Sequence, residues 1–245
     1  MMNIPKMILF DFGQTLSDEG KFDGVRGSKE ILKYAVSNKY HLSPEQLQEK
    51  ANELNRALGR FSRETRHLLQ TEIPNHMFTA YLYESLGIKL SLSPEEIDTV
   101  FWNAAAPGKP TEGVENFLEY LHEKGIRTGV ISNISFAGSV VKERIQKLLP
   151  SHHFEFIICT SEYLFRKPHE KIFELALEMA NLSREDVWYI GDDYECDVLG
   201  ARNAEIFPVR YTGALGTSYE RRSDVTEISS WADLQEYIEN QRRGQ

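Results

Sequence analysis

The stretch that decides the fold is ILFDFGQTL, residues Ile8–Leu16, in which an apolar run ends in the carboxylate of Asp11. A short, continuous apolar run is typical of a strand that is covered on both faces. Two residues after the aspartate stands Gly13, which has no side chain, and Gln14 and Thr15 follow it. We therefore expect a buried strand that carries Asp11 to its own carboxyl end, followed by a tight turn.

Outward from this stretch, apolar runs alternate with amphipathic helical patterns. This alternation predicts an α/β fold with a doubly wound parallel sheet. Proline in the last run, Pro208, favours an edge strand, because proline cannot donate a ladder hydrogen bond. The expected strands are Lys6–Phe10, Thr128–Ser132, Phe154–Cys159, Val187–Gly191 and Glu205–Val209. The expected helices are Glu112–Gly125, Ser139–Pro150 and His169–Asn181.

Residues 17–110 interrupt the alternation and have the pattern of successive helices. SPEQ (Ser43–Gln46) and SPEE (Ser93–Glu96) have the form of capping boxes with proline at the first helical position. Phe78–Gly87 has the pattern of another helix, closed by its glycine. The sequence thus predicts two domains: an α/β core formed by residues 1–16 and 111–245, and an all-helical domain formed by residues 17–110.

Composition excludes several classes of partner. The chain has 245 residues, is 41% hydrophobic and carries a formal net charge of -9, which argues against a nucleic-acid partner. No apolar run reaches the roughly 18 residues of a membrane span. The first residues do not resemble a signal peptide, and two cysteines do not make a disulfide framework. We expect a cytoplasmic protein; the sequence does not predict an oligomeric state.

Polar residues that suit phosphoryl transfer follow the expected strands. In doubly wound sheets ligands bind at the carboxyl ends of the strands, so these residues should meet at one edge. Paired carboxylates suit Mg²⁺, a carboxylate can attack phosphorus, and a hydroxyl and an ammonium can hold phosphoryl oxygens. The residues concerned are Asp11, Ser132, Asn133, Lys167, Asp192, Asp193 and Asp197.

Four motifs in this order resemble those of the haloacid dehalogenase superfamily of hydrolases. They are DFGQTL (Asp11–Leu16), SN (Ser132–Asn133), KP (Lys167–Pro168) and GDDYECD (Gly191–Asp197). Each motif by itself has low specificity, but all four occur in the family's order, each at the end of an expected strand. The resemblance implies a Rossmann-like core, and it implies that the inserted helices form a cap that closes over the core and selects the substrate.

The resemblance also implies roles for individual residues. Asp11 would be the nucleophile, assisted by Ser132 and Lys167 as catalytic residues. The Mg²⁺ ligands would be Asp11, the backbone carbonyl of Gly13, and Asp192. The residues expected to support the metal site are Asp193 and Asp197. The residues expected to bind substrate or phosphate are Gly13, Gln14, Thr15, Ser132, Asn133 and Lys167.

The sequence departs from the family pattern at two adjacent positions. Most phosphatases of the family carry a second aspartate where this chain has Gly13, and that aspartate protonates the leaving group and then activates water. Loss of a positioned acid or base typically costs about 10²–10⁴-fold in rate. The next position is usually glycine and is Gln14 here. Asp18 and Glu19 are candidates to approach from the inserted helices and replace the missing acid.

We interpret the chain as a Mg²⁺-dependent phosphatase that acts on a small phosphorylated metabolite through an aspartyl-phosphate on Asp11. One alternative is a binding or regulatory protein that keeps the scaffold without efficient turnover, as the glycine at position 13 suggests. A second is a metal-independent 2-haloacid dehalogenase. A third is a phosphonate-cleaving enzyme that uses a lysine of the cap, for which the candidates are Lys21, Lys29, Lys33, Lys39 and Lys50.

Overall fold

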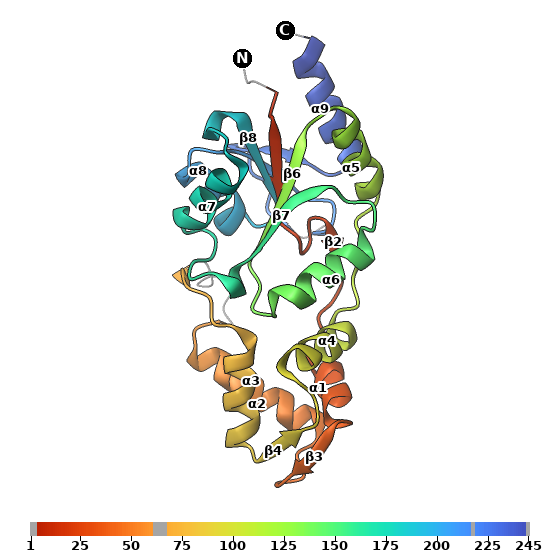
Figure 1. Ribbon diagram of the computed structural model, residues 1–245, viewed down its shortest axis with the longest axis vertical. Coiled ribbons are helices and arrows are strands. Elements are labelled where there is room, and N and C mark those ends of the chain that lie inside the picture. Colours follow the sequence, from red (N-terminus) through yellow and green to blue (C-terminus); the bar gives the residue numbers. More distant parts are fainter. Residues whose placement is uncertain (1–3, 61–67, 217–218, 244–245) are drawn as a thin grey trace.

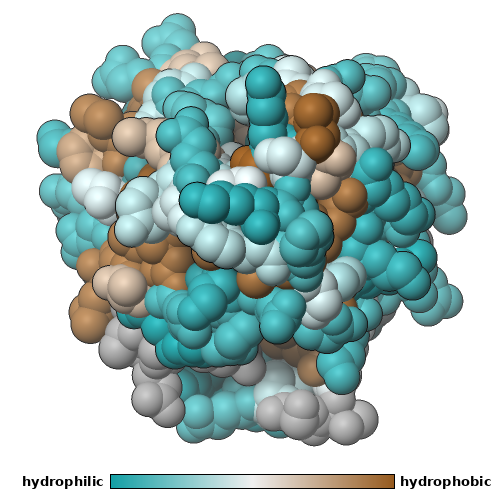
Figure 2. Space-filling model, turned by 90° about the horizontal axis from the view of Figure 1, so that it is seen from below, coloured by the Kyte–Doolittle hydropathy of each residue, from teal (hydrophilic) through white to brown (hydrophobic). Residues whose placement is uncertain are grey.

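The computed structural model describes residues 4–60, 68–216 and 219–243. The molecule is elongated, with a sheet and its covering helices in one half and a group of helices beyond the end of the sheet in the other (Figure 1). Seen from the end formed by that second group, the surface is mainly hydrophilic and is broken by separate hydrophobic patches (Figure 2). Within the described residues, no helix combines the length and apolar character needed to cross a membrane.

The first half is built on one six-stranded sheet in the order β10-β9-β8-β1-β6-β7. Every neighbouring pair is parallel, and β1 lies between β6 and β8. The predicted doubly wound parallel sheet is therefore confirmed. The strands are β1 (Met7–Phe10), β6 (Arg127–Ser132), β7 (Phe154–Cys159), β8 (Val187–Gly191), β9 (Phe207–Tyr211) and β10 (Thr226–Ile228).

Helices cover both faces of this sheet, as the continuous apolar strands predict. Side chains of successive strand residues point to opposite faces. In β1, Ile8 and Phe10 join a core with Phe117 and Trp231, whereas Leu9 packs into a separate core on the other face. The helices that supply these two cores are α5 (Val114–Glu123), α6 (Gly138–Leu148) and α9 (Trp231–Arg243) on one face, and α7 (Glu170–Ala180) and α8 (Gly200–Asn203) on the other.

The expectation of an edge position for the strand that contains Pro208 is wrong, because β10 lies outside β9. The proline is compatible with this position for a local reason. Pro208 is in register with Tyr189 of β8, but pairing with β10 begins only at the next residue, where Val209 faces Thr226. Pro208 therefore precedes the stretch of β9 that pairs with β10, so its missing N–H group removes no hydrogen bond from that pairing.

The inserted segment, which we define as residues 17–110, contains four helices and a small sheet in its described parts, residues 17–60 and 68–110. Ser43 and Ser93 form both predicted capping boxes. The expectation of helices alone missed an antiparallel pair of short strands, which are too brief to give a periodic sequence signal. The elements are α1 (Gly24–Leu32), β3 (Ala35–Asn38), α2 (Pro44–Ala57), α3 (Asn75–Ser85), β4 (Ile88–Leu90) and α4 (Pro94–Ala105).

The inserted segment leaves the core and returns to it at adjacent points. Strand β2 (Ser17–Asp18) pairs antiparallel with β5 (Lys109–Pro110), so the outgoing and returning chains lie side by side. Helix α4 also contacts α6 of the core, where Arg144 donates hydrogen bonds to Asn103 and to the carbonyl of Ala106. The inserted segment is thus anchored next to the carboxyl end of β1.

Candidate active site

Strand β1 delivers the carboxylate of Asp11 to a cavity of about 360 Å³. The backbone N–H of Asp11 still donates to the carbonyl of Ile190 in β8, at 2.8 Å, which holds the residue against the neighbouring strand. Ser132, the last residue of β6, and Asp192, directly after β8, line the same cavity. The sheet therefore gathers the polar strand ends at one edge, as parallel topology requires.

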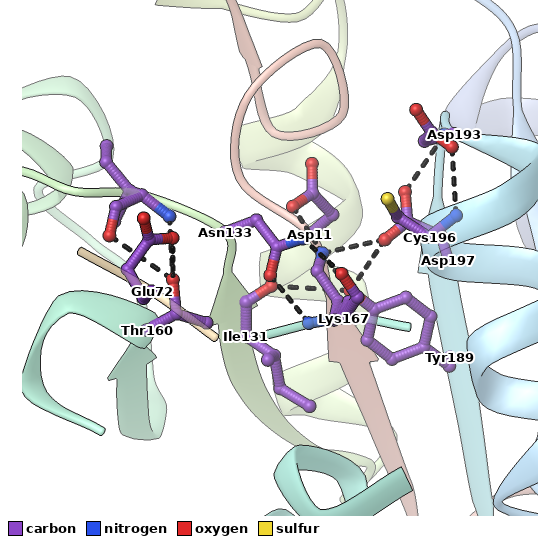
Figure 3. Close-up of polar contacts among 11 residues, drawn as sticks. Asp11, Glu72, Ile131, Asn133, Thr160, Lys167, Tyr189, Asp193, Cys196 and Asp197 are labelled. Carbon is purple, nitrogen blue, oxygen red and sulfur yellow. Dashed lines mark hydrogen bonds and ion pairs between the residues drawn. The ribbon is translucent and has the colours of Figure 1, made fainter. Parts of the chain in front are cut away.

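The ammonium of Lys167 lies at the centre of this polar cluster (Figure 3). It lies 2.7 Å from Oδ1 of Asp11, 2.7 Å from Oδ1 of Asp197 and 2.6 Å from the hydroxyl of Tyr189. The side chain is 1% exposed. An ammonium has three protons to donate, so these three acceptors match its full capacity. Lys167 consequently fixes the orientation of the Asp11 carboxylate.

Asn133 holds the backbone of Lys167 in place. Its amide oxygen accepts from the N–H of Lys167 at 2.8 Å, and its amide nitrogen donates to the carbonyl of Lys167 at 2.8 Å. These two reciprocal bonds use one donor and one acceptor of the amide and leave one N–H and one lone pair, and Asn133 also lines the cavity. Asn133 therefore positions the lysine, and its contact with phosphate stays a prediction from the sequence.

Three carboxylates converge beside this lysine. Asp11, Asp192 and Asp197 each offer one oxygen, and these oxygens lie within 4.8 Å of one another. Carboxylate oxygens at such separations are the donor type that Mg²⁺ prefers. One ammonium among three carboxylates leaves an excess of negative charge, which a divalent cation would neutralise. The donor set of this site thus fits Mg²⁺.

The same crowding shifts the protonation equilibria. Burial raises the pKa of Asp11 to about 6, with Lys167 opposing the rise and Asp197 adding to it. Burial and then the charge of Asp197 hold the pKa of Asp192 well above its ordinary value. Burial alone would lower the pKa of Lys167, but the charges of Asp11 and Asp197 outweigh it and hold that pKa above its ordinary value. The lysine is therefore charged at neutral pH.

The loop after β8 brings Asp197 back toward the strand. Asp193 caps the helical turn η4 (Tyr194–Leu199) by accepting from the backbone N–H groups of Glu195 and Cys196. Oδ2 of Asp197 accepts from the N–H of Asp193 at 2.9 Å. Gly191 permits this close return, because a Cβ there would lie 2.3 Å from the Asp197 carboxylate. The two expected supporting acids are thus engaged in shaping the loop.

The turn after β1 has open space at Gly13 and an unusual backbone at Gln14. Both residues line the cavity. A Cβ at Gly13 would meet nothing nearer than Cγ of Glu19, at 3.9 Å, so a side chain would fit there. Gln14 has a φ of 60°, in the left-handed region that favours glycine. The left-handed backbone at Gln14 gives a physical reason why the family pattern has glycine at this position.

Ser132 and Thr15 occupy different environments. Ser132 lines the cavity, as expected. Thr15 is fully buried and is not among the cavity-lining residues, so its geometry does not support contact with phosphate. Its carbonyl accepts from the hydroxyl of Thr111 at 2.9 Å, which ties the turn to the start of the returning core chain.

Of the two acids considered as replacements for the missing one, only Glu19 lines the cavity. Its carboxylate accepts from the hydroxyl of Ser17 at 2.7 Å, from Nε1 of Trp102 at 3.0 Å and from Nη2 of Arg144 at 3.1 Å. The Glu19 carboxylate is thus the acceptor in all three contacts, and these contacts hold its orientation. Asp18 instead lies 3.5 Å from the ammonium of Lys109, outside the lining of the cavity.

The five lysines considered for a phosphonate-cleaving enzyme also lie elsewhere. Among the described residues that line the cavity, Lys167 is the sole lysine. Lys33 and Lys50 pair with glutamates on their own helices. The geometry therefore offers no lysine of the inserted segment to a substrate in this cavity.

Sequence reasoning missed two contributors. The hydroxyl of Tyr189 contacts Lys167 and, at 3.1 Å, Asp197. A phenol in an otherwise apolar strand was the signal that could have identified it. Arg166 lines the cavity and reaches Glu72 of the inserted segment at 3.4 Å, while Glu72 accepts from Thr160 at 2.9 Å (Figure 3). Glu72 links the inserted segment to the core beside Lys167.

This fold and site define a hydrolase of the haloacid dehalogenase class. Residues 8–210 match the haloacid dehalogenase-like hydrolase family, and the chain belongs to that family. Among curated relatives, it is 32% identical over 138 residues to glyceraldehyde 3-phosphate phosphatase of Methanothermobacter thermautotrophicus, covering 53% of this chain and 59% of the relative. It is 31% identical over 124 residues to pyrimidine 5'-nucleotidase YjjG of Escherichia coli, covering 50% and 54%. The chain thus spans little more than half the length of these relatives.

Two solved structures share the fold over nearly the whole chain. A 2-haloacid dehalogenase from Pseudomonas syringae pv. Tomato has a TM-score of 0.67 at 21% identity, covering 96% of this chain and 99% of that one. A phosphatase of the superfamily from Thermococcus onnurineus has a TM-score of 0.65 at 19% identity, covering 95% and 97%. Because these two proteins carry different activities on one fold, the likeness confirms the fold alone.

Proposed function

We propose that the protein is a Mg²⁺-dependent phosphatase that hydrolyses small phosphorylated molecules through an aspartyl-phosphate on Asp11. The observation that supports this most is the convergence of Asp11, Asp192 and Asp197 around the ammonium of Lys167 at the end of β1. The curated relatives support the reaction class, because one is named for a phosphorylated triose and the other for pyrimidine nucleotides.

In this proposal Asp11, the backbone carbonyl of Gly13, and Asp192 would hold Mg²⁺. The bound ion would supply positive charge that offsets the repulsion between the acids and an anionic substrate. Lys167 orients the carboxylate of Asp11, which attacks phosphorus while the bond to the leaving oxygen breaks. Ser132 would hold a phosphoryl oxygen, and the positive charge of Lys167, whose N–H groups meet Asp11, Asp197 and Tyr189, would offset the negative charge of the phosphoryl group. Water then attacks the aspartyl-phosphate and regenerates the carboxylate.

The proton for the leaving group is the weak point of this mechanism. Gly13 cannot donate it, and Glu19 is held by Arg144 and Trp102. Substrates with good leaving groups would therefore be favoured, since they depart without a proton. The same observation supports a second candidate, a phosphate-binding regulatory protein with little turnover. The cluster of acids favours either of these over a metal-independent dehalogenase.

We also propose a division of the chain into two domains. Residues 17–110 would form the cap domain over a core of residues 1–16 and 111–245, with the boundaries at the β2–β5 pair. A cytoplasmic location stays a prediction from the sequence.

Hydrolysis of p-nitrophenyl phosphate with and without Mg²⁺ tests the proposal, together with Asp11→Asn. We expect turnover that requires the metal and is lost in the variant. Asp186→Asn is a matched control, because that acid pairs with Lys6 on the exposed surface at the opposite end of the sheet. Phosphate binding without turnover would support the regulatory candidate. Metal-independent halide release from a 2-haloacid would support the dehalogenase.

A further inference from the structure

A second cavity, of about 310 Å³, lies next to the catalytic one and is lined mostly by the inserted segment, with Ser135 and Phe136 of the core completing the lining. Phe22 and Phe136 line both cavities, so the two spaces adjoin at these rings. A cavity of this size is at the lower end of those that hold small molecules. A leaving group that extends from a phosphate beside Asp11 toward these two rings would approach the second cavity.

One wall of this second cavity carries neutral amides. Gln48, Asn52 and Asn55 of α2 line it, and their i, i+4, i+7 spacing places them on one face of the helix. The row is ordered by hydrogen bonds, since Ser28 donates to Gln48 at 3.0 Å and Gln48 donates to Asn52 at 2.8 Å. We call Gln48, Asn52 and Asn55 the amide row. Packing of a hydrophobic core does not require amide side chains, so the amide row is available for another role.

The amide row retains capacity for a ligand. Among the described residues, none forms a hydrogen bond with the side chain of Asn55. Each amide presents both an acceptor and donors. Arg60 also lines the cavity, but its guanidinium pairs with the buried Glu72 at 2.8 Å. The cavity thus offers neutral donors and acceptors rather than a free charge.

Aromatic rings form another part of the lining. Phe78 and Phe101 line the second cavity together with the shared rings of Phe22 and Phe136. Phe22 is 56% exposed although it is apolar, and its ring lies 6.0 Å from that of Phe101. Flat apolar faces beside a row of amides suit a planar ring that stacks on its faces and forms hydrogen bonds along its edge.

We propose that the second cavity binds the leaving group of the substrate, and that this group carries a planar hydrogen-bonding heterocycle, as in a nucleoside 5'-monophosphate. The heterocycle would stack against Phe22 or Phe136 and pair its edge with the amide row. The inference rests on the proposed phosphatase function, because it places the phosphate at Asp11. A phosphorylated triose would fill only the first cavity.

The test compares kcat/KM for uridine and adenosine 5'-monophosphates with that for ribose 5-phosphate, which has the same phosphorylated sugar without the base. We expect at least one nucleotide to be preferred by tenfold or more. Asn55→Leu, which keeps the approximate size and removes the amide, should lower this ratio by about tenfold, mainly through KM. Glu53→Ala, on the exposed side of the same helix, should leave the ratio unchanged.

Further measurements separate the failure of this inference from the failure of the proposed function. Equal rates for nucleotides and ribose 5-phosphate would overturn the inference and leave the phosphatase intact. If no ester is hydrolysed, calorimetry with uridine and adenosine still tests the cavity. Binding that is weakened by Asn55→Leu and not by Glu53→Ala would support the inference, and an absence of binding would overturn it.

Discussion

The Nζ atom of Lys167 lies 2.7 Å from Oδ1 of Asp11, although the two residues are 156 positions apart in the chain. Both side chains are buried, so the contact is not an incidental surface ion pair. Two neighbouring strands and the Asn133 bonds to the lysine backbone define its geometry. The candidate nucleophile therefore has a fixed orientation before any ligand arrives.

Removal of this lysine should destabilise the fold as well as stop catalysis. Lys167→Met leaves Asp11 and Asp197 buried without their cation, and breaking a buried pair typically costs about 3–5 kcal/mol in the free energy of unfolding. Because burial raises the pKa of Asp11 to about 6, this carboxyl is mostly protonated at pH 5, and the loss should be smaller at pH 5 than at pH 8. Urea unfolding at both pH values measures it. Lys6→Met, at an exposed pair, should cost little at either pH.

Restoration of an acid at position 13 should raise activity. The backbone there has space for a side chain, with Cγ of Glu19 as its nearest neighbour at 3.9 Å. Gly13→Asp should increase kcat on alkyl phosphates by about 10²-fold or more, since general acids contribute on that scale. The gain on p-nitrophenyl phosphate should be smaller, because its leaving group needs no proton. Gly13→Asn is the matched control, and an equal gain with asparagine would refute proton donation as the cause.

Loss of the Tyr189 hydroxyl should affect turnover more than binding. The hydroxyl lies 2.6 Å from Nζ of Lys167 and 3.1 Å from Oδ1 of Asp197, so it positions the ammonium. Tyr189→Phe should lower kcat by about tenfold, equivalent to a net hydrogen-bond contribution near 1.4 kcal/mol, with KM little changed. Steady-state kinetics across pH measures this. Tyr81→Phe, at an exposed ring, is the control. A matched fall in stability with unchanged kcat would instead indicate a structural role alone.

Magnesium should stabilise the protein more at pH 7.5 than at pH 5. Burial raises the pKa of Asp11 to about 6, so the group is mostly protonated at pH 5 and the proton competes with the metal. The metal-free protein should lose stability as pH rises from 4 through 6, because the charged carboxylate is disfavoured in the folded state. Thermal unfolding with and without Mg²⁺ tests both effects. Asp192→Asn should reduce the metal-dependent rise in Tm; an undiminished rise would exclude this site.

The sequence was sufficient to predict five of the six strands that the described residues form in the main sheet, and the edge at which polar residues gather; β10 was not expected. Apolar runs locate strands, and parallel topology then brings their carboxyl ends together, whatever the distance along the chain. The same reasoning placed Asp11, Ser132, Lys167 and Asp192 around one space. These conclusions need only the order and type of elements.

What could not be predicted depends on side-chain direction and on short elements. The side chain of Asn133 points toward the backbone of Lys167, and the phenol of Tyr189 reaches the Lys167 ammonium from within β8. The spacing of residues along the sequence predicts neither side-chain orientation. The pair β3–β4 was missed because three or four residues give no period. Pro208 led to a wrong prediction of an edge strand, because β9 pairs with β10 only from Val209 onward, after the proline.

The pairing of β2 with β5 separates two kinds of change in this molecule. The segment proposed to surround the leaving group leaves the core and returns to it at this one pair of short strands. The residues proposed to perform the chemistry lie at strand ends and in loops outside that segment. Substitutions, or even exchange of the whole segment, can therefore retune which molecule is accepted without disturbing the register of β1 and its neighbours. Under this proposal, selectivity depends on the inserted segment and reactivity depends on the core.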